Sequence, residues 1–116
     1  MPVLGAFLLW ASPLPATEAL AGLYETSQME VAAALELQTG GHFRYALEYG
    51  AVSERGEGDW GFDGRSVRLT SNPMPPAFHA LELGNARFDN EALTLKDGDL
   101  FLRRYDTVFR FRRVKP

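Results

Sequence analysis

From residue 22 onward, apolar and polar side chains alternate with a period of two. The clearest runs are residues 29–38 and 42–49, where every second position is apolar or aromatic. Such alternation is typical of β-strands that bury one face, whereas an amphipathic helix repeats about every 3.6 residues. The helical period is absent after residue 22, so we expect an all-β fold.

The loop between these two runs predicts how they pair. Residues 39–41 read Thr-Gly-Gly, a three-residue hairpin loop in which glycine supplies a positive φ. This loop places Leu37 opposite Phe43 on the inner face, and Glu36 opposite Arg44 on the outer face. A slip of one residue would turn every apolar side chain to the other face, so this register is expected.

Further turns are predicted where Asp, Gly or Asn interrupt the alternation. They are Asp63-Gly64, Gly84-Asn85, Asp97-Gly98 and a turn near Tyr105-Asp106. The cross-strand pairs that follow are Trp60 with Val67, Leu95 with Leu100, and Leu102 with Phe109. Gly84-Asn85 would bring Leu81 near Phe88.

These runs and turns describe an antiparallel up-and-down meander of eight or nine short strands. Strands are expected at residues 22–26, 29–38, 42–50, 57–62, 65–71, 77–83, 86–88 or 91–96, 99–104 and 107–114. A meander of this kind must close into a small barrel or sandwich to bury one face and to cover its edges. The many inward-facing aromatic residues predict an interior mostly filled by side chains.

Several of these segments resemble bacterial lipocalin-like envelope domains. The resemblance rests on residues 35–45 (LELQTGGHFRY), Gly58-Asp59-Trp60, Asp63-Gly64 and residues 67–71 (VRLTS). Residues 30–78 also resemble a widespread family of uncharacterised exported bacterial proteins. The resemblance implies a small lipocalin-like β-barrel. It implies no activity, because the shared motifs belong to turns and core.

Composition fits a single folded domain at residues 22–116. The chain has 116 residues, of which 46% are hydrophobic and 23% charged. That length can bury a core without metal ions or disulfides. The absence of cysteine excludes thiol catalysis and thiolate metal sites. A formal net charge of −3 disfavours nucleic acid as a partner.

Residues 1–21 form a separate segment with two interpretations. Residues 3–10 are uniformly apolar, and small residues follow near Ala16 and at Ala19-Leu20-Ala21. This pattern fits a secretory signal peptide cleaved near Ala16 or Ala21, although the segment carries no Lys or Arg before the apolar run. Such a chain would be periplasmic or secreted. Otherwise residues 1–21 are a short apolar helix or arm of a cytoplasmic protein. The apolar run is too short to span a membrane.

We predict no catalytic residue, no metal site and no cofactor. His42 follows a turn on the outer face and His79 shares the face of Leu81, and no spacing joins them into a metal site. Carboxylates are numerous, but no acid pair is placed in a cleft. Residues 103–116 carry six basic side chains and one acidic one. They form either a last strand docked among acidic strands or a patch for an anionic partner.

A binding site is expected at the barrel end that has the longer loops, because loops on a rigid scaffold commonly carry function. We expect that end to carry the connections at residues 26–28, 50–58, 72–76 and 97–98. The candidate rim residues are Tyr24, Tyr49, Glu54, Arg55, Glu57, Met74 and Pro75. The first hypothesis is an exported binding module for an apolar small ligand or for a protein or peptide. The alternative is a filled barrel, such as an inhibitor or envelope-stress component, that acts through a surface edge or face.

Overall fold

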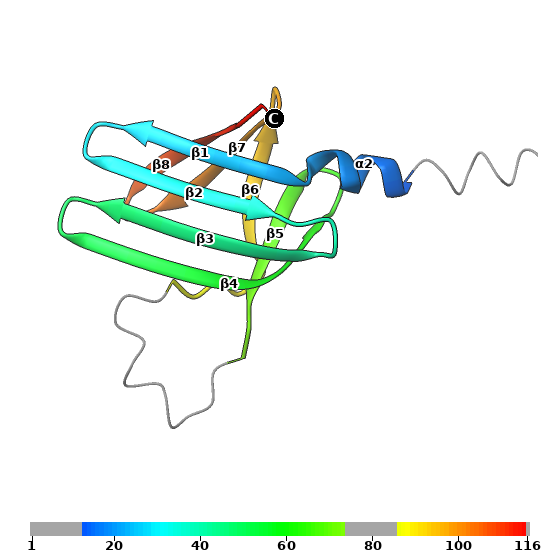
Figure 1. Ribbon diagram of the computed structural model, residues 1–116, viewed down its shortest axis with the longest axis horizontal. Helices are drawn as coiled ribbons and strands as arrows, with labels where there is room; N and C mark the ends of the chain where they lie inside the picture. Colours follow the sequence, from blue (N-terminus) through cyan, green and yellow to red (C-terminus); the bar gives the residue numbers. More distant parts are fainter. Residues whose placement is uncertain (1–12, 74–85, 116) are drawn as a thin grey trace, which may run out of the picture.

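The computed structural model describes residues 13–73 and 86–115. Its elements are α2 (Pro13–Leu20), β1 (Gly22–Gln28), β2 (Val31–Leu37), β3 (His42–Tyr49), β4 (Val52–Phe62), β5 (Ser66–Ser71), β6 (Glu91–Lys96), β7 (Asp99–Arg104) and β8 (Thr107–Arg113). The eight strands form a closed barrel in which each strand pairs with the next, and β8 pairs with β1 (Figure 1). Every pairing is antiparallel, which confirms the predicted up-and-down barrel.

The predicted register holds for most of the hairpins. β2 and β3 pair Leu37 with Phe43 and Glu36 with Arg44. Leu95 lies opposite Leu100 across β6 and β7, and Leu102 lies opposite Phe109 across β7 and β8. In the loop between β2 and β3, Gly41 is the glycine with positive φ, at 89°. Turn composition and alternation therefore predicted these pairs correctly.

The β4–β5 register differs from the prediction by two residues. Trp60 lies opposite Leu69, and Val67 lies opposite Phe62. The cause is Asp63, whose Oδ1 accepts hydrogen bonds from the backbone N–H groups of the two residues Arg65 and Ser66. Asp63 therefore stands before the turn rather than inside it, a role that Asp side chains favour. Because the shift is even, every side chain keeps its predicted face.

β4 begins five residues earlier than predicted. The segment expected as a loop from residue 50 to 58 is a tight turn at Gly50-Ala51, followed by strand from Val52. Residues 86–88 are not in a strand, so the alternative at 91–96 is correct. The predicted strand at 77–83 and turn at 84–85 lie outside the described residues.

The barrel has two ends with different connections. The helix end carries the turns at 38–41, 63–65 and 97–98, together with α2. The aromatic end carries the turns at 29–30, 50–51 and 105–106, and the chain at 72–73 and 86–90. The turns at 97–98 and 105–106 therefore lie at the opposite ends from those predicted, because β5 pairs directly with β6, whereas the predicted meander placed one further strand, at residues 77–83, between them.

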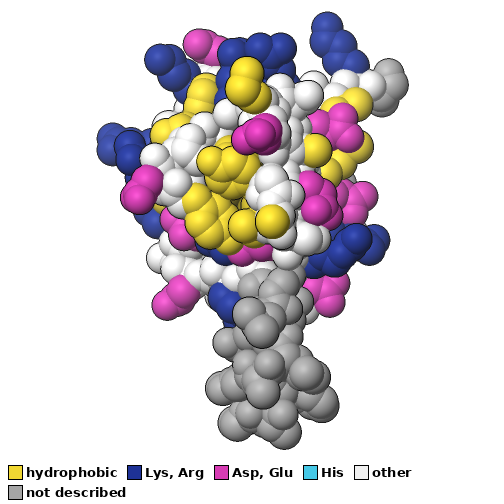
Figure 2. Space-filling view, turned by 90° about the vertical axis from the view of Figure 1, so that its left-hand side faces the viewer, with side chains coloured by type: hydrophobic (Ala, Val, Ile, Leu, Met, Phe, Trp, Pro, Cys, Tyr) yellow, Lys and Arg dark blue, Asp and Glu magenta, His cyan; other side chains and the backbone are white. Residues whose placement is uncertain are grey.

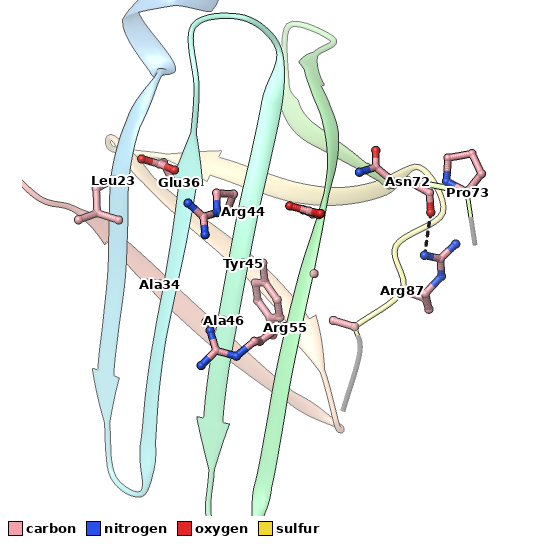
Figure 3. A pocket seen from close by; sticks show the side chains of 13 residues that line it. Leu23, Ala34, Glu36, Arg44, Tyr45, Ala46, Arg55, Asn72, Pro73 and Arg87 are labelled. Atoms are coloured by element: carbon pink, nitrogen blue, oxygen red, sulfur yellow. Dashed lines mark hydrogen bonds between the residues drawn. The ribbon is translucent and has the colours of Figure 1, made fainter. Parts of the chain in front are cut away.

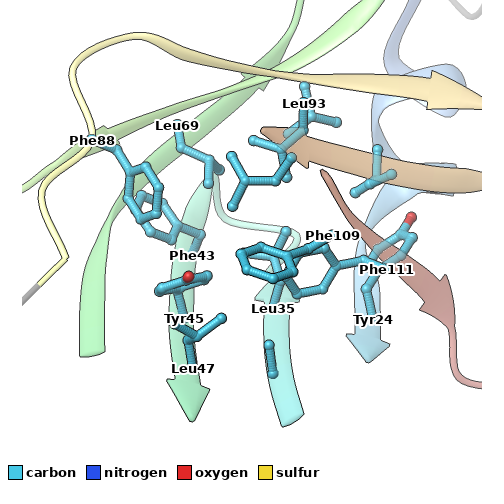
Figure 4. Packing of buried hydrophobic residues seen from close by; sticks show 14 of the residues in the cluster. Tyr24, Leu35, Phe43, Tyr45, Leu47, Leu69, Phe88, Leu93, Phe109 and Phe111 are labelled. Carbon is cyan, nitrogen blue, oxygen red and sulfur yellow. The ribbon is translucent and has the colours of Figure 1, made fainter. Parts of the chain in front are cut away.

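Side chains from all eight strands fill the barrel interior. The largest fully buried ones are Tyr24, Phe43, Phe109 and Phe111, and the labelled residues pack toward one another in Figure 4. Gly58 permits the close approach of β4 and β5 at one side of this core, since a Cβ there would lie 2.0 Å from the backbone oxygen of Thr70. The interior is thus a packed core, as its aromatic content predicted.

Candidate functional site

The structure divides the predicted rim residues into three groups. Tyr49 and Glu54 lie at the aromatic end, on β3 and β4. Arg55 and Glu57 lie on the outer face of β4, where both are exposed. Tyr24 is fully buried and belongs to the helix end instead. Met74 and Pro75 lie outside the described residues.

The aromatic end contains an ion pair between two distant strands. Arg104, the last residue of β7, donates from Nε to Glu54 Oε1 at 3.1 Å and from Nη2 to Oε2 at 2.8 Å. The side chains of Glu54 and Arg104 are only 9% and 21% exposed. β4 pairs with β5 only from Gly58 to Phe62, so Glu54 lies in the part of β4 that has no β5 neighbour. A bidentate, largely buried pair of this kind has a fixed geometry.

Two aromatic rings flank the guanidinium of Arg104. Its Cζ lies 5.2 Å from the ring centroid of Phe88 and 5.2 Å from that of Tyr105, distances at which a cation is attracted to a ring face. The backbone of residues 86–88 is held against β4 and β5. Ala86 N–H donates to Arg55 O at 2.6 Å, and Phe88 N–H donates to the hydroxyl of Ser71 at 2.8 Å.

Gly56 makes room for this segment. A Cβ at Gly56 would lie 2.9 Å from the backbone oxygen of Ala86, closer than real Cβ contacts allow. Gly56 also lies directly opposite Tyr45 across β3 and β4. The absence of a side chain at this position therefore lets the segment carrying Phe88 reach the barrel wall.

The turn between β7 and β8 has an unusual backbone. Tyr105 and Asp106 both have positive φ, at 55° and 57°. Such a turn normally contains Asn or Gly, and a bulky residue there costs energy. The turn sets the Tyr105 ring 6.2 Å from that of Tyr49, which also meets Phe109 edge-on at 5.8 Å. Strained backbone of this kind tends to occur at functional sites.

Tyr45 adds a buried hydroxyl close to the ion pair. The residue is 3% exposed, and its Oη has no hydrogen-bond partner within the described part of the chain. Burial raises the pKa of Tyr45, and the charge of Glu54 raises it further. A buried polar atom without a partner is costly, so it calls for a water or a ligand group beside it.

The ionisation of this cluster is set by its own members. Burial would raise the pKa of Glu54, but the hydrogen bonds from Arg104, the nearby hydroxyl of Tyr105 and the charge of Arg104 outweigh it, so that pKa lies below its usual value. Hydrogen bonding to Glu54 raises the pKa of Arg104. Burial, followed by the contact with Glu54, raises the pKa of Tyr105. The pair is therefore ionised at neutral pH.

Apolar side chains surround this cluster on the surface. Figure 2 looks onto the aromatic end and shows hydrophobic side chains gathered near its centre, with charged side chains around them. The exposed members from its turns and strand ends are Met29, Val52, Tyr105 and Val108. Three exposed carboxylates belong to the same end, those of Glu30, Glu48 and Asp106. Exposed apolar surface rimmed by polar groups often marks an interaction site.

A second feature lies on the outer face of the barrel. A shallow hollow of about 750 Å³ lies over β1–β4 and is lined by Arg44, Arg55 and Glu57 among others (Figure 3). Ala34 and Ala46, which lie directly opposite each other, form part of its floor. Arg55 and Glu57 thus come together here, apart from Tyr49 and Glu54.

The helix end holds the chain that precedes β1. The hydroxyl of Tyr24 donates to Leu20 O at 2.7 Å, and Arg113 donates to the backbone oxygens of Ala19 and Ala21. Leu20 and Ala21 also pack against the core. These residues are therefore part of the fold. Tyr24 has a structural position rather than the rim position predicted for it.

Few of the remaining charged groups in the described part of the chain form ion pairs. His42 is exposed beside Asp59, with 2.9 Å between Nδ1 and Oδ1, as expected for a turn residue on the outer face. His79 lies outside the described residues. Arg110 of β8 pairs with Asp99, and Arg104 of β7 pairs with Glu54, so two of the basic side chains of residues 103–116 meet a carboxylate.

Residues 13–73 and 86–115 contain no group of three or more His, Asp and Glu side chains that could hold a metal ion. Over the same residues, no helix has the length and apolar character needed to cross a bilayer. Comparison with family models, with curated proteins and with solved structures found no match to the chain. The resemblance to lipocalin-like envelope domains therefore stays a prediction, and the site must be judged from its geometry.

Proposed function

We propose that this protein is a non-catalytic binding module that docks a protein or peptide at the aromatic end of its barrel. The supporting observation is that exposed apolar side chains, among them Met29, Val52 and Tyr105, lie at the same barrel end as the Glu54–Arg104 pair and the aromatic rings beside it. Tyrosine and arginine are the residue types that most often anchor interfaces. A methionine exposed at a turn, as Met29 is at 91%, adapts readily to a partner surface.

The filled interior favours a surface partner over an apolar ligand enclosed within the barrel. Phe43, Phe109 and Phe111 occupy the space that a hollow barrel would leave for a ligand, and each is at most 1% exposed. An eight-stranded barrel is only wide enough either to be filled by side chains or to hold one small ligand. Here the side chains support the first arrangement.

We also propose that the module is exported. The apolar run at residues 3–10 supports this location. Because Arg113 and Tyr24 bind the backbone of residues 19–21, cleavage near Ala16 is compatible with the fold, whereas cleavage after Ala21 would remove these contacts. Mass spectrometry of the protein from its native host tests this. A mature chain that begins near Thr17 is expected, and an intact Met1 would contradict export by this route.

The docking site is tested with two matched double variants. Val52→Ser with Val108→Ser changes the aromatic end, where these residues are 38% and 42% exposed. Leu23→Ser with Val114→Ser is the control, because these residues are each 39% exposed but lie toward the helix end. Each protein is immobilised and used to capture partners from an extract of the native host.

We expect the control to retain the partner captured by the unchanged protein, and the aromatic-end variant to lose it. Loss in the control alone would place the interface elsewhere. A third variant, Ala34→Gln with Ala46→Gln, fills the outer hollow. If only that variant loses the partner, the outer face of β2 and β3 is the docking site.

A further inference from the structure

Arg104 is held by the groups that proteins use to recognise an arginine from another molecule. A carboxylate receives two parallel hydrogen bonds from its guanidinium, and aromatic rings lie 5.2 Å from its Cζ. The planar guanidinium fork suits both contacts, whereas the point charge of a lysine suits neither as well. The surroundings of Arg104 are thus a guanidinium site occupied by the chain's own side chain.

The walls of this site come from separate elements. Glu54 belongs to β4, and Phe88 belongs to the segment between β5 and β6. Both are held by contacts that do not involve Arg104, namely the β3–β4 pairing and the hydrogen bonds between residues 86–88 and the neighbouring strands. The site would therefore keep these walls if Arg104 rotated away.

The side chain of Arg104 lies at a position from which it can move out of this site. Arg104 is the last residue of β7, and its side chain retains 21% exposure. It precedes a turn in which two non-glycine residues have positive φ. Such conformations carry an energetic cost, which weakens the end of the hairpin that carries Arg104.

The site also contains a polar group to which Arg104 makes no hydrogen bond. The hydroxyl of Tyr45 is buried and has no partner among the described residues, although its pKa responds to the charges of both Glu54 and Arg104. A guanidinium has five N–H donors, and the Glu54 contact takes two of those of Arg104. A guanidinium entering from a partner would have donors to spare for Tyr45.

We propose that Glu54, Phe88, Tyr105 and Tyr45 form a binding site for an arginine side chain of the docked partner, which replaces Arg104. The inference rests on the proposed docking at the aromatic end. Exchange of one arginine for another keeps Glu54 paired, so no buried charge is left alone. The exposed carboxylates of Glu30, Glu48 and Asp106 outnumber the exposed guanidinium of Arg103 at this end and would attract a basic partner segment.

The test uses a small probe and needs no partner. Arg104→Ala vacates the site, and the protein is titrated with N-acetyl-L-arginine amide while its melting temperature and tyrosine ring NMR signals are followed. We expect saturable binding with a rise in melting temperature. N-acetyl-L-lysine amide, the control of equal charge, should bind at least about tenfold more weakly because it lacks the bidentate fork.

The unchanged protein and a second variant complete the test. If Arg104 fills the site more than about nine-tenths of the time, the unchanged protein should bind the arginine probe at least about tenfold more weakly than Arg104→Ala. Adding Glu54→Gln to Arg104→Ala should abolish the preference for arginine over lysine. If Arg104→Ala does not fold, Arg104→Gln replaces it.

Equal responses to the two probes, or an arginine response that survives Glu54→Gln, would overturn the guanidinium site. Absence of any saturable response would do the same. None of these results depends on capture of a partner. Failure of the site and failure of docking at the aromatic end are therefore distinguished, because the second is decided by the Val52 and Val108 variants.

Discussion

The two ends of the barrel treat their polar groups differently. At the helix end, the indole N–H of Trp60 donates to Gln38 O at 2.8 Å, Asp63 caps two backbone N–H groups, and Arg113 binds two backbone oxygens. At the aromatic end, Tyr45 Oη lacks a partner among the described residues. Of the described non-glycine residues with positive φ, Glu30, Asn90, Tyr105 and Asp106 lie at the aromatic end and Asp97 lies at the helix end. The helix end thus stabilises the fold, and the aromatic end retains unsatisfied and strained groups.

This difference is what a binding module requires. Groups optimised for binding are rarely optimal for folding, so stability must come from elsewhere in the domain. Regions that rearrange on binding are also those with the lowest local stability. The comparison predicts that substitutions at the helix end change stability, whereas surface substitutions at the aromatic end change binding.

The largest effect is expected at Trp60. Truncation by Trp60→Ala should lower the free energy of unfolding by about 3–5 kcal/mol, because a large buried side chain is lost. Trp60→Phe keeps most of the apolar contact but loses the hydrogen bond to Gln38 O, and should cost less than half as much. Denaturant unfolding measures both. A loss below about 1 kcal/mol for Trp60→Ala would remove Trp60 from the core.

The next effect concerns the ion pair and its dependence on pH. Glu54→Gln should cost about 2–3 kcal/mol at pH 7, less than for a fully buried pair because Arg104 retains some exposure. The folded-state pKa of Glu54 is lowered, so its carboxylate stabilises the fold above the unfolded-state pKa. That contribution is lost as the pH falls through the folded-state pKa.

Unfolding of the unchanged protein and of Glu54→Gln should therefore be compared from neutral to acidic pH. The difference in their free energies of unfolding is expected to shrink steadily below the unfolded-state pKa of about 4.3. A difference that stays constant down to low pH would show that the charge of Glu54 does not stabilise the fold.

Two N-terminal truncations measure how much the backbone contacts of residues 19–21 contribute to stability. Removal of residues 1–21 deletes the acceptors of Arg113 and Tyr24 and should cost about 1–3 kcal/mol, the range for hydrogen bonds to charged groups and for unpaired buried groups. Removal of residues 1–16 leaves these contacts and should cost much less. Thermal unfolding of both forms gives the comparison. Equal losses would mean that the backbone of residues 19–21 contributes nothing.

The smallest stability effect is expected at the exposed turns of the aromatic end. Met29→Ser should change the free energy of unfolding by less than about 0.5 kcal/mol, because Met29 is 91% exposed. Val52 is 38% exposed, so Val52→Ser should cost more, but less than about 1.5 kcal/mol. Denaturant unfolding checks this beside the capture experiment. A larger loss would show that these residues belong to the packed fold rather than to a free surface.

The sequence was most informative where local patterns decide the structure. The period-two alternation and the Gly and Asp turns predicted the barrel, its packed interior and the β2–β3, β6–β7 and β7–β8 registers. The β4–β5 register was missed because Asp63 can occupy two positions of a turn. Only its side-chain contacts with the following N–H groups distinguish them.

The candidate site was predicted less completely. Tyr49 and Glu54 were placed at the correct end, but Arg104 was not recognised as the partner of Glu54. The two residues are 50 positions apart, and the one extra strand predicted between β5 and β6, at residues 77–83, assigned the 105–106 turn to the opposite end. Phe88 was missed because its contact with Arg104 depends on the approach of residues 86–88 to Gly56, which alternation does not reveal.

Amide hydrogen exchange under native conditions tests the contrast between the two ends most directly. The backbone N–H of Trp60, which donates to Gly41 O at 2.8 Å, reports on the helix end. The backbone N–H of Gly50, which donates to Glu30 O at 3.1 Å, reports on the aromatic end. We expect Trp60 N–H to exchange only through global unfolding. Gly50 N–H and the amides of residues 104–108 should exchange through local opening, with free energies at least about 2 kcal/mol lower. Equal protection at both ends, or greater protection at the aromatic end, would contradict the account.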